Sequence, residues 1–94
     1  MKDKKELKGE QILPIVDARW QVRAFAEAME EVLKKNDHKG GWSSNECTIE
    51  YLQHRLVEEM GEYFRSLEMD VQPSWRQKEL LGIANFCMML WDRS

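Results

Sequence analysis

The chain of 94 residues has little of several features that define common classes of small protein. Its two cysteines form no CxxC pair, which excludes a disulfide framework and a zinc ribbon. Its net charge of -3 argues against a general nucleic-acid-binding surface. No apolar run is long enough to span a bilayer, and the charged first residues carry no secretory signal. We therefore expect a cytoplasmic protein with neither a nucleic-acid partner nor a membrane partner.

The small size of the chain limits the stability that it can reach alone. A domain of this length buries only about 60% of the surface that its unfolded chain exposes. The hydrophobic fraction of 43% is ordinary for a folded domain and excludes global disorder. Because a disulfide framework is excluded, the remaining supports are a bound metal, an oligomer, or both.

Apolar periodicity divides the chain into an arm and one helical domain. Residues 1–12 are charged and poor in apolar side chains, so we expect a flexible N-terminal arm, with the helical domain over 13–94. Apolar residues recur at helical spacing, which predicts an all-α fold with principal helices near 14–36, 48–68 and 75–92. We expect Thr48 to cap the second helix and Ser74 to open the third through a capping box.

The third predicted helix is apolar on nearly every side between Leu80 and Trp91. Such a helix must be covered all round, and two other helices of one small chain can hardly do that. We therefore expect a helical bundle completed by homo-oligomerisation, as a dimer or a tetramer. Phe86, Met89 and Leu90 are expected to be buried between helices or subunits.

Three acidic residues stand beside predicted core positions. Glu59 and Glu62 lie one turn apart at the edge of the second helix's apolar stripe, and Glu79 stands where the third helix's apolar run begins. Carboxylates near a core need a cation, and Mg²⁺ prefers oxygen ligands. Two interpretations stay open: a shared metal site, or a solvated acidic edge in which Arg55 pairs with Glu59 and Glu79 complements a helix dipole.

These acids belong to a sequence that resembles the all-α nucleoside triphosphate pyrophosphohydrolases of the MazG type, especially small members from phages and mobile elements. That family carries ExxE and, after a variable spacer, ExxD. Glu59 and Glu62 match the first motif, and Glu79 opens the second. The flanking segments agree in order and extend the resemblance over residues 15–92: FAEAMEEVLKKNDHKGGW at 25–42, YLxxRL at 51–56 and IANFCMML at 83–90.

The resemblance implies a house-cleaning enzyme that hydrolyses a (deoxy)nucleoside triphosphate to the monophosphate and pyrophosphate. It implies that Glu59, Glu62 and Glu79 are the catalytic metal ligands and that Mg²⁺ is the cofactor. It also implies a self-assembling helical bundle, with the base near the first helix and the following loop. The candidate substrate-binding residues are Trp20, Phe25, His38, Lys39, Trp42 and Asn85.

The chain departs from the family pattern at Gly82, where the second motif usually has Asp. Three accounts stay open: weak activity with three carboxylates, help from Glu58 or Asn85, or a non-catalytic module that dimerises or binds a nucleotide. Because position 82 is one turn after Glu79, an Asp there is expected to add a fourth carboxylate and raise Mg²⁺ affinity.

Several other residues each carry two interpretations. Trp42 is either a base-stacking platform or an apolar plug, and Lys39 either meets phosphate or is solvated. Asn85, the only polar side chain of the apolar run, contacts the nucleotide, joins Glu79 in a network, or bridges subunits. A di-iron bundle is disfavoured, because neither His38 nor His54 stands at a Glu-x-x-His offset from a core glutamate.

Overall fold

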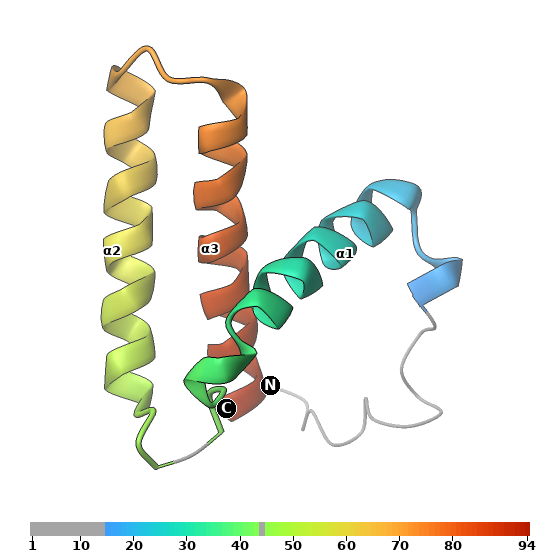
Figure 1. Ribbon diagram of the computed structural model, residues 1–94, viewed down its shortest axis with the longest axis vertical. Helices are drawn as coiled ribbons and strands as arrows, with labels where there is room; N and C mark the ends of the chain where they lie inside the picture. Colours follow the sequence, from blue (N-terminus) through green and yellow to red (C-terminus); the bar gives the residue numbers. More distant parts are fainter. Residues whose placement is uncertain (1–14, 44) are drawn as a thin grey trace.

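The computed structural model describes residues 15–43 and 45–94, and in this part of the chain it is helical without strands. Its main elements are α1 (Trp20–Lys35), α2 (Ile49–Glu68) and α3 (Pro73–Arg93), joined by short segments (Figure 1). Two short 3-10 helices, η3 (Ile15–Asp17) and η4 (Asp37–Lys39), flank α1. The all-α prediction is confirmed, whereas the predicted arm over 1–12 lies outside the described residues.

The helix ends agree with the sequence prediction in part. The Thr48 hydroxyl accepts a hydrogen bond from the Tyr51 N–H at 3.0 Å, which confirms the predicted cap of α2. The capping box at Ser74 is wrong, because α3 already begins at Pro73 and has no side-chain cap. Proline suits a first helical position, since its fixed φ fits the helix and it has no N–H to satisfy.

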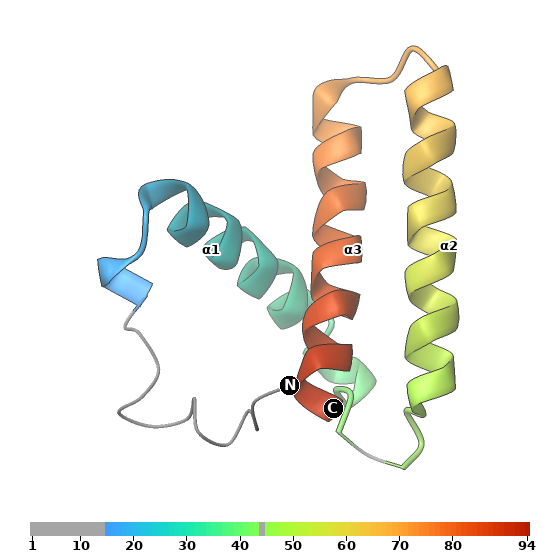
Figure 2. The same ribbon diagram turned by 180° about the vertical axis from the view of Figure 1, so that it is seen from behind.

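The helices α2 and α3 run antiparallel, side by side, and form a long hairpin in both views (Figures 1 and 2). The second half of α1 approaches the C-terminal half of α3, while the first half of α1 stands away from the hairpin (Figure 2). Asn85 of α3 joins these two helices, because its Nδ2 donates a hydrogen bond to the Met29 carbonyl oxygen at 3.3 Å. The loop after α1 therefore lies beside the open end of the hairpin.

The hydrophobic core of a single chain is very small. Leu52 is the one fully buried apolar side chain among the described residues, at 1% exposure. Phe86, Met89 and Leu90 are half-buried, so their expected burial is not reached within one chain. Large apolar side chains are exposed on all three helices, among them Trp20, Val22, Phe25, Val57, Met60, Phe64, Leu67, Trp75, Leu80 and Trp91. Within the described segments, no helix is both long and apolar enough to cross a bilayer.

Candidate metal centre and adjoining cavity

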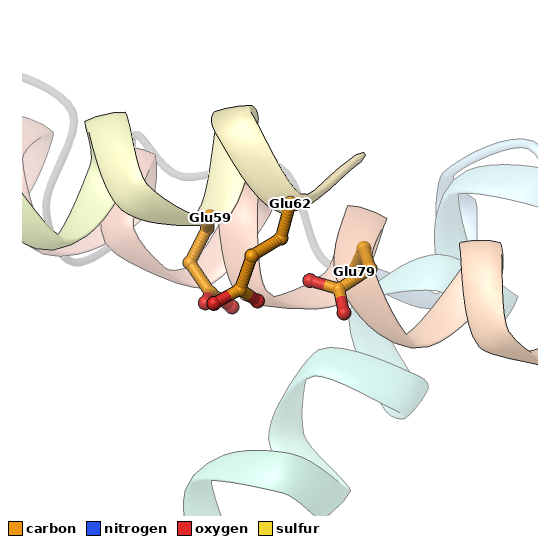
Figure 3. Close-up of side chains that lie close together, drawn as sticks. All are labelled: Glu59, Glu62 and Glu79. Carbon is orange, nitrogen blue, oxygen red and sulfur yellow. The ribbon is translucent and has the colours of Figure 1, made fainter. Parts of the chain in front are cut away.

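The structure brings the three predicted acids together between α2 and α3. Glu59 and Glu62 lie one turn apart on α2, and the antiparallel hairpin sets Glu79 of α3 opposite them (Figure 3). One carboxylate oxygen from each residue lies within 4.8 Å of the others. The separation is short enough for one cation to bridge all three side chains.

Burial makes the negative charge of this cluster costly. Glu79 is only 7% exposed and the Glu59 side chain 15%, while Glu62 faces solvent. Burial raises the pKa of Glu59, and the neighbouring Glu62 carboxylate adds to that rise. Burial also raises the pKa of Glu79, helped by a hydrogen bond with Glu62 and by repulsion from both other acids. The cluster therefore favours either a bound proton or a bound cation.

Arg55 neutralises only one edge of the cluster. Its guanidinium lies 3.6 Å from the Glu59 carboxylate (Nη2 to Oε2) and 2.8 Å from the Glu58 carboxylate (Nη1 to Oε1). The hydrogen bond with Glu58 raises the pKa of Arg55, so the guanidinium stays charged. The expected pair with Glu59 is thus present, but no cation of the described residues lies within ion-pair distance of Glu62 or Glu79.

The missing side chain at Gly82 makes room for the cluster. A Cβ built at this position would overlap Oε1 of Glu59 and lie 3.2 Å from its Cδ. The Glu59 carboxylate therefore occupies the space in which a side chain of residue 82 would begin. A fourth carboxylate at this position requires Glu59 to move, which the spacing of the motif alone does not reveal.

A cavity of about 530 Å³ adjoins the cluster and shares Glu59 with it. Its walls come from the end of α1, the following loop, and the facing sides of α2 and α3. Three of the predicted substrate-binding residues line it: Lys39, Trp42 and Asn85. His38, Trp20 and Phe25 do not line it; all three are exposed, the latter two on the half of α1 that stands away from the hairpin.

The sequence did not assign to substrate binding three side chains that line this cavity beside Glu59. Tyr51 and Arg55 precede Glu59 on α2 at successive one-turn intervals, and Phe86 follows Gly82 by one turn on α3. The Arg55 guanidinium lies over the Phe86 ring, 5.2 Å from its centroid. The one-turn spacing shows that these side chains share a helix face, but it predicts a cavity wall only once the position of the facing helix is known.

The end of α3 fixes the loop that closes the cavity. The Trp42 indole donates a hydrogen bond to the Asp92 carboxylate at 3.1 Å. The Arg93 guanidinium donates to the carbonyl oxygens of Trp42, at 2.6 Å, and of Cys47. Trp42 is therefore held in place as part of the cavity wall. No sequence signal pointed to this anchor.

The donor set fits a hard divalent cation. Three carboxylates supply oxygen ligands in close proximity, and oxygen is the ligand type that hard divalent cations prefer. Comparisons of the chain with protein-family models, with curated proteins and with solved structures found no match in any of the three. The acid cluster, the cavity and the sequence motifs are therefore the grounds on which a function is proposed.

Proposed function

We propose that this chain is a Mg²⁺-dependent nucleoside triphosphate pyrophosphohydrolase, which converts a (deoxy)nucleoside triphosphate to the monophosphate and pyrophosphate. One observation carries the proposal: three carboxylates converge within 4.8 Å beside a cavity lined by aromatic and cationic side chains. Glu59 belongs to both features. A nucleotide whose base fills the cavity would therefore extend its phosphates toward the acids. The resemblance to MazG-type enzymes supports the same chemistry.

The side chains divide into three tasks in this proposal. Glu59, Glu62 and Glu79 would hold Mg²⁺, which supplies charge neutralisation for the triphosphate and lowers the pKa of an attacking water. Trp42 and Phe86 would stack on the base from two sides of the cavity. The lining cations Lys39 and Arg55 would attract the phosphates into the site.

We further propose that the active form is a homo-oligomer in which a second copy of the chain covers the exposed apolar faces. Val57, Met60, Phe64 and Leu67 form one exposed stripe along α2, because they recur at one-turn spacing. A second hairpin laid along this stripe would give a four-helix bundle with an isologous interface. A second copy is the occupant favoured here, because among the described residues Leu52 alone is a fully buried apolar side chain, so a single chain has a very small core.

The oligomer is tested by sedimentation velocity on the wild type and on Phe64→Glu. Phe64 is 57% exposed, so the carboxylate of the variant would face water in a monomer but an apolar surface in the proposed dimer. We expect a dimer or tetramer for the wild type and dissociation for the variant. A wild-type chain that stays a folded monomer at high concentration would exclude the proposal.

A second candidate function is a non-catalytic module that binds a nucleotide or only dimerises. Gly82 favours it, since this position supplies no ligand and its space is filled by Glu59. The two candidates share the cavity and the apolar faces, but they differ in turnover. Pyrophosphate release therefore separates them directly.

The decisive experiment measures pyrophosphate release from a panel of ribo- and deoxyribonucleoside triphosphates with Mg²⁺ and with EDTA. We expect metal-dependent release that Glu79→Gln abolishes. Glu68→Gln is the matched control, because Glu68 is an exposed glutamate in the last turn of α2, outside the cluster. Absence of release from every nucleotide would overturn the hydrolase and leave the binding module.

A further inference from the structure

Part of the cavity wall comes from residues that no helix holds in place. Trp42 and Cys47 line the cavity from the connection between η4 and α2, and neither belongs to a helix. Gly40 and Gly41, which precede Trp42, both have positive φ, at 92° and 74°. Because glycine adopts many backbone conformations at little steric cost, this segment does not by itself fix where the Trp42 ring lies.

The last turn of α3 supplies the contacts that fix it. The Asp92 carboxylate accepts a hydrogen bond from the Trp42 indole at 3.1 Å, which sets the direction of the ring. The Arg93 guanidinium donates to the carbonyl oxygens of both Trp42 and Cys47, so one side chain ties the two wall residues together. Each of these hydrogen bonds involves a charged group, and such bonds are stronger than those between neutral groups.

We infer that Asp92 and Arg93 are positioning residues, which set how tightly the cavity binds a nucleotide by holding Trp42 in its wall. The inference rests on the proposed function only in that the cavity takes a nucleotide. Neither residue lines the cavity, so both act through Trp42. A ligand that meets an ordered wall does not have to order it on binding. If Trp42 occupied its place for only about a tenth of the time, the apparent affinity would fall about tenfold.

The test measures the binding of the α,β-methylene analogues of ATP, GTP, CTP and UTP in Mg²⁺ by calorimetry. These analogues resist cleavage between the α- and β-phosphates, so the readout requires no turnover. Asp92→Leu removes the acceptor of the indole and should weaken the best-bound analogue by about tenfold, the order of effect for one hydrogen bond with a charged group. Asp92→Asn keeps an oxygen acceptor and should bind within about threefold of the wild type, by the same reasoning.

A double-mutant cycle with Trp42→Phe separates positioning from a general loss of structure. Phenylalanine keeps an aromatic ring in the wall but has no N–H to donate to Asp92. In this background Asp92→Leu should change the affinity by less than about twofold, because the interaction that it removes is already absent. Asp70→Leu is the matched control, since Asp70 is exposed between α2 and α3 and outside this cavity, and it should bind as the wild type does.

The role of Arg93 is tested in the same titrations. Arg93→Gln removes the charged donor and should weaken binding by about tenfold, whereas Arg93→Lys keeps a charge and should weaken it less. Wild-type affinity in Arg93→Gln would remove Arg93 from the inference. Circular dichroism melting of each variant shows that a lost affinity is not a lost fold.

The outcomes separate this inference from the proposed activity. Wild-type affinity in Asp92→Leu, an equal loss in the Trp42→Phe background, or no binding of any analogue would each overturn the inference. Pyrophosphate release by a protein whose affinity does not depend on Asp92 would leave the hydrolase standing and remove the positioning role. Binding that depends on Asp92 through Trp42, without release from the natural triphosphates, would support the positioning role in a binding module and remove the hydrolase.

Discussion

Replacing Gly82 by alanine tests whether the space left by the glycine is what allows the Glu59 carboxylate to join the acid cluster. The new Cβ would overlap Oε1 of Glu59, so the Glu59 carboxylate must rotate away from α3. That movement takes one of the three carboxylates out of the cluster and weakens the ion pair with Arg55. The stability of the fold should therefore stay the same or rise, while the Mg²⁺ affinity of the proposed metal site falls.

The expected magnitudes follow from these contacts. Alanine in place of glycine inside a helix stabilises by about 1 kcal/mol. For a domain of this size that raises the Tm by roughly 4–8 °C. At 3.6 Å the part-buried pair between Arg55 and Glu59 is worth about 1 kcal/mol or less, and moving Glu59 into water relieves carboxylate repulsion. We expect unchanged or higher stability in EDTA, with Mg²⁺ affinity at least about tenfold lower, since even outer-shell partners of a metal contribute that much.

Gly61→Ala supplies the matched control. Gly61 is also a glycine inside a helix, but a Cβ there meets nothing within 4 Å. It should give a similar gain in Tm with no change in Mg²⁺ affinity. Melting curves with and without Mg²⁺ at one fixed protein concentration, together with calorimetric titration, measure both quantities. If Gly82→Ala binds Mg²⁺ as tightly as the wild type, the reasoning from the contact with Glu59 is refuted.

Gly82→Asp extends the same test. Motif spacing alone leads to the expectation that a fourth carboxylate raises Mg²⁺ affinity and activity. The overlap with Glu59 changes that expectation, because the Asp Cβ displaces the ligand that is already there. We expect Asp to recover affinity that Ala loses without exceeding the wild type. Affinity clearly above the wild type would mean that Glu59 moves without cost and that the motif logic holds.

Three further predictions concern pH, the loop and the core. The pKa values of Glu59 and Glu79 are raised in the folded state, so the folded chain keeps protons that the unfolded chain has already lost. Without metal, the free energy of unfolding should therefore fall as the pH rises above the usual glutamate range. Urea titrations in EDTA should show a weaker pH dependence for Glu79→Gln. Arg93→Gln removes a charged donor from two loop carbonyls, so we expect a loss of about 1–3 kcal/mol and greater quenching of tryptophan fluorescence by acrylamide. Leu52→Ala should cost about 2–5 kcal/mol in chemical denaturation, and a loss below 1 kcal/mol would show that this residue is not the centre of the core.

Helical periodicity was sufficient to predict the principal helices of the fold, while the family resemblance was needed to select the three acids as candidate metal ligands. Glu59 and Glu62 share a helix edge by spacing alone, and a short turn before Pro73 makes the next helix return beside them. The contact of Glu59 with Gly82 could not be predicted, since it depends on how far apart two helices pack. The same applies to the anchor from Arg93 to the loop, because one charged residue after an apolar run specifies no partner.

The small core and the acidic site have one structural cause. The two more buried acids of the cluster, Glu59 and Glu79, lie in the seam between α2 and α3, where a hairpin of this length would otherwise pack apolar side chains. Polar Asn85 and Ser66 are also buried, and Leu52 alone is a fully buried hydrophobe among the described residues. Because charged and polar groups occupy the seam, less apolar surface is buried there, and burial of apolar surface is what stabilises a small domain. In the proposed function a cation neutralises the seam and a second copy covers the outer faces, so metal binding and assembly are expected to act on the same folding equilibrium.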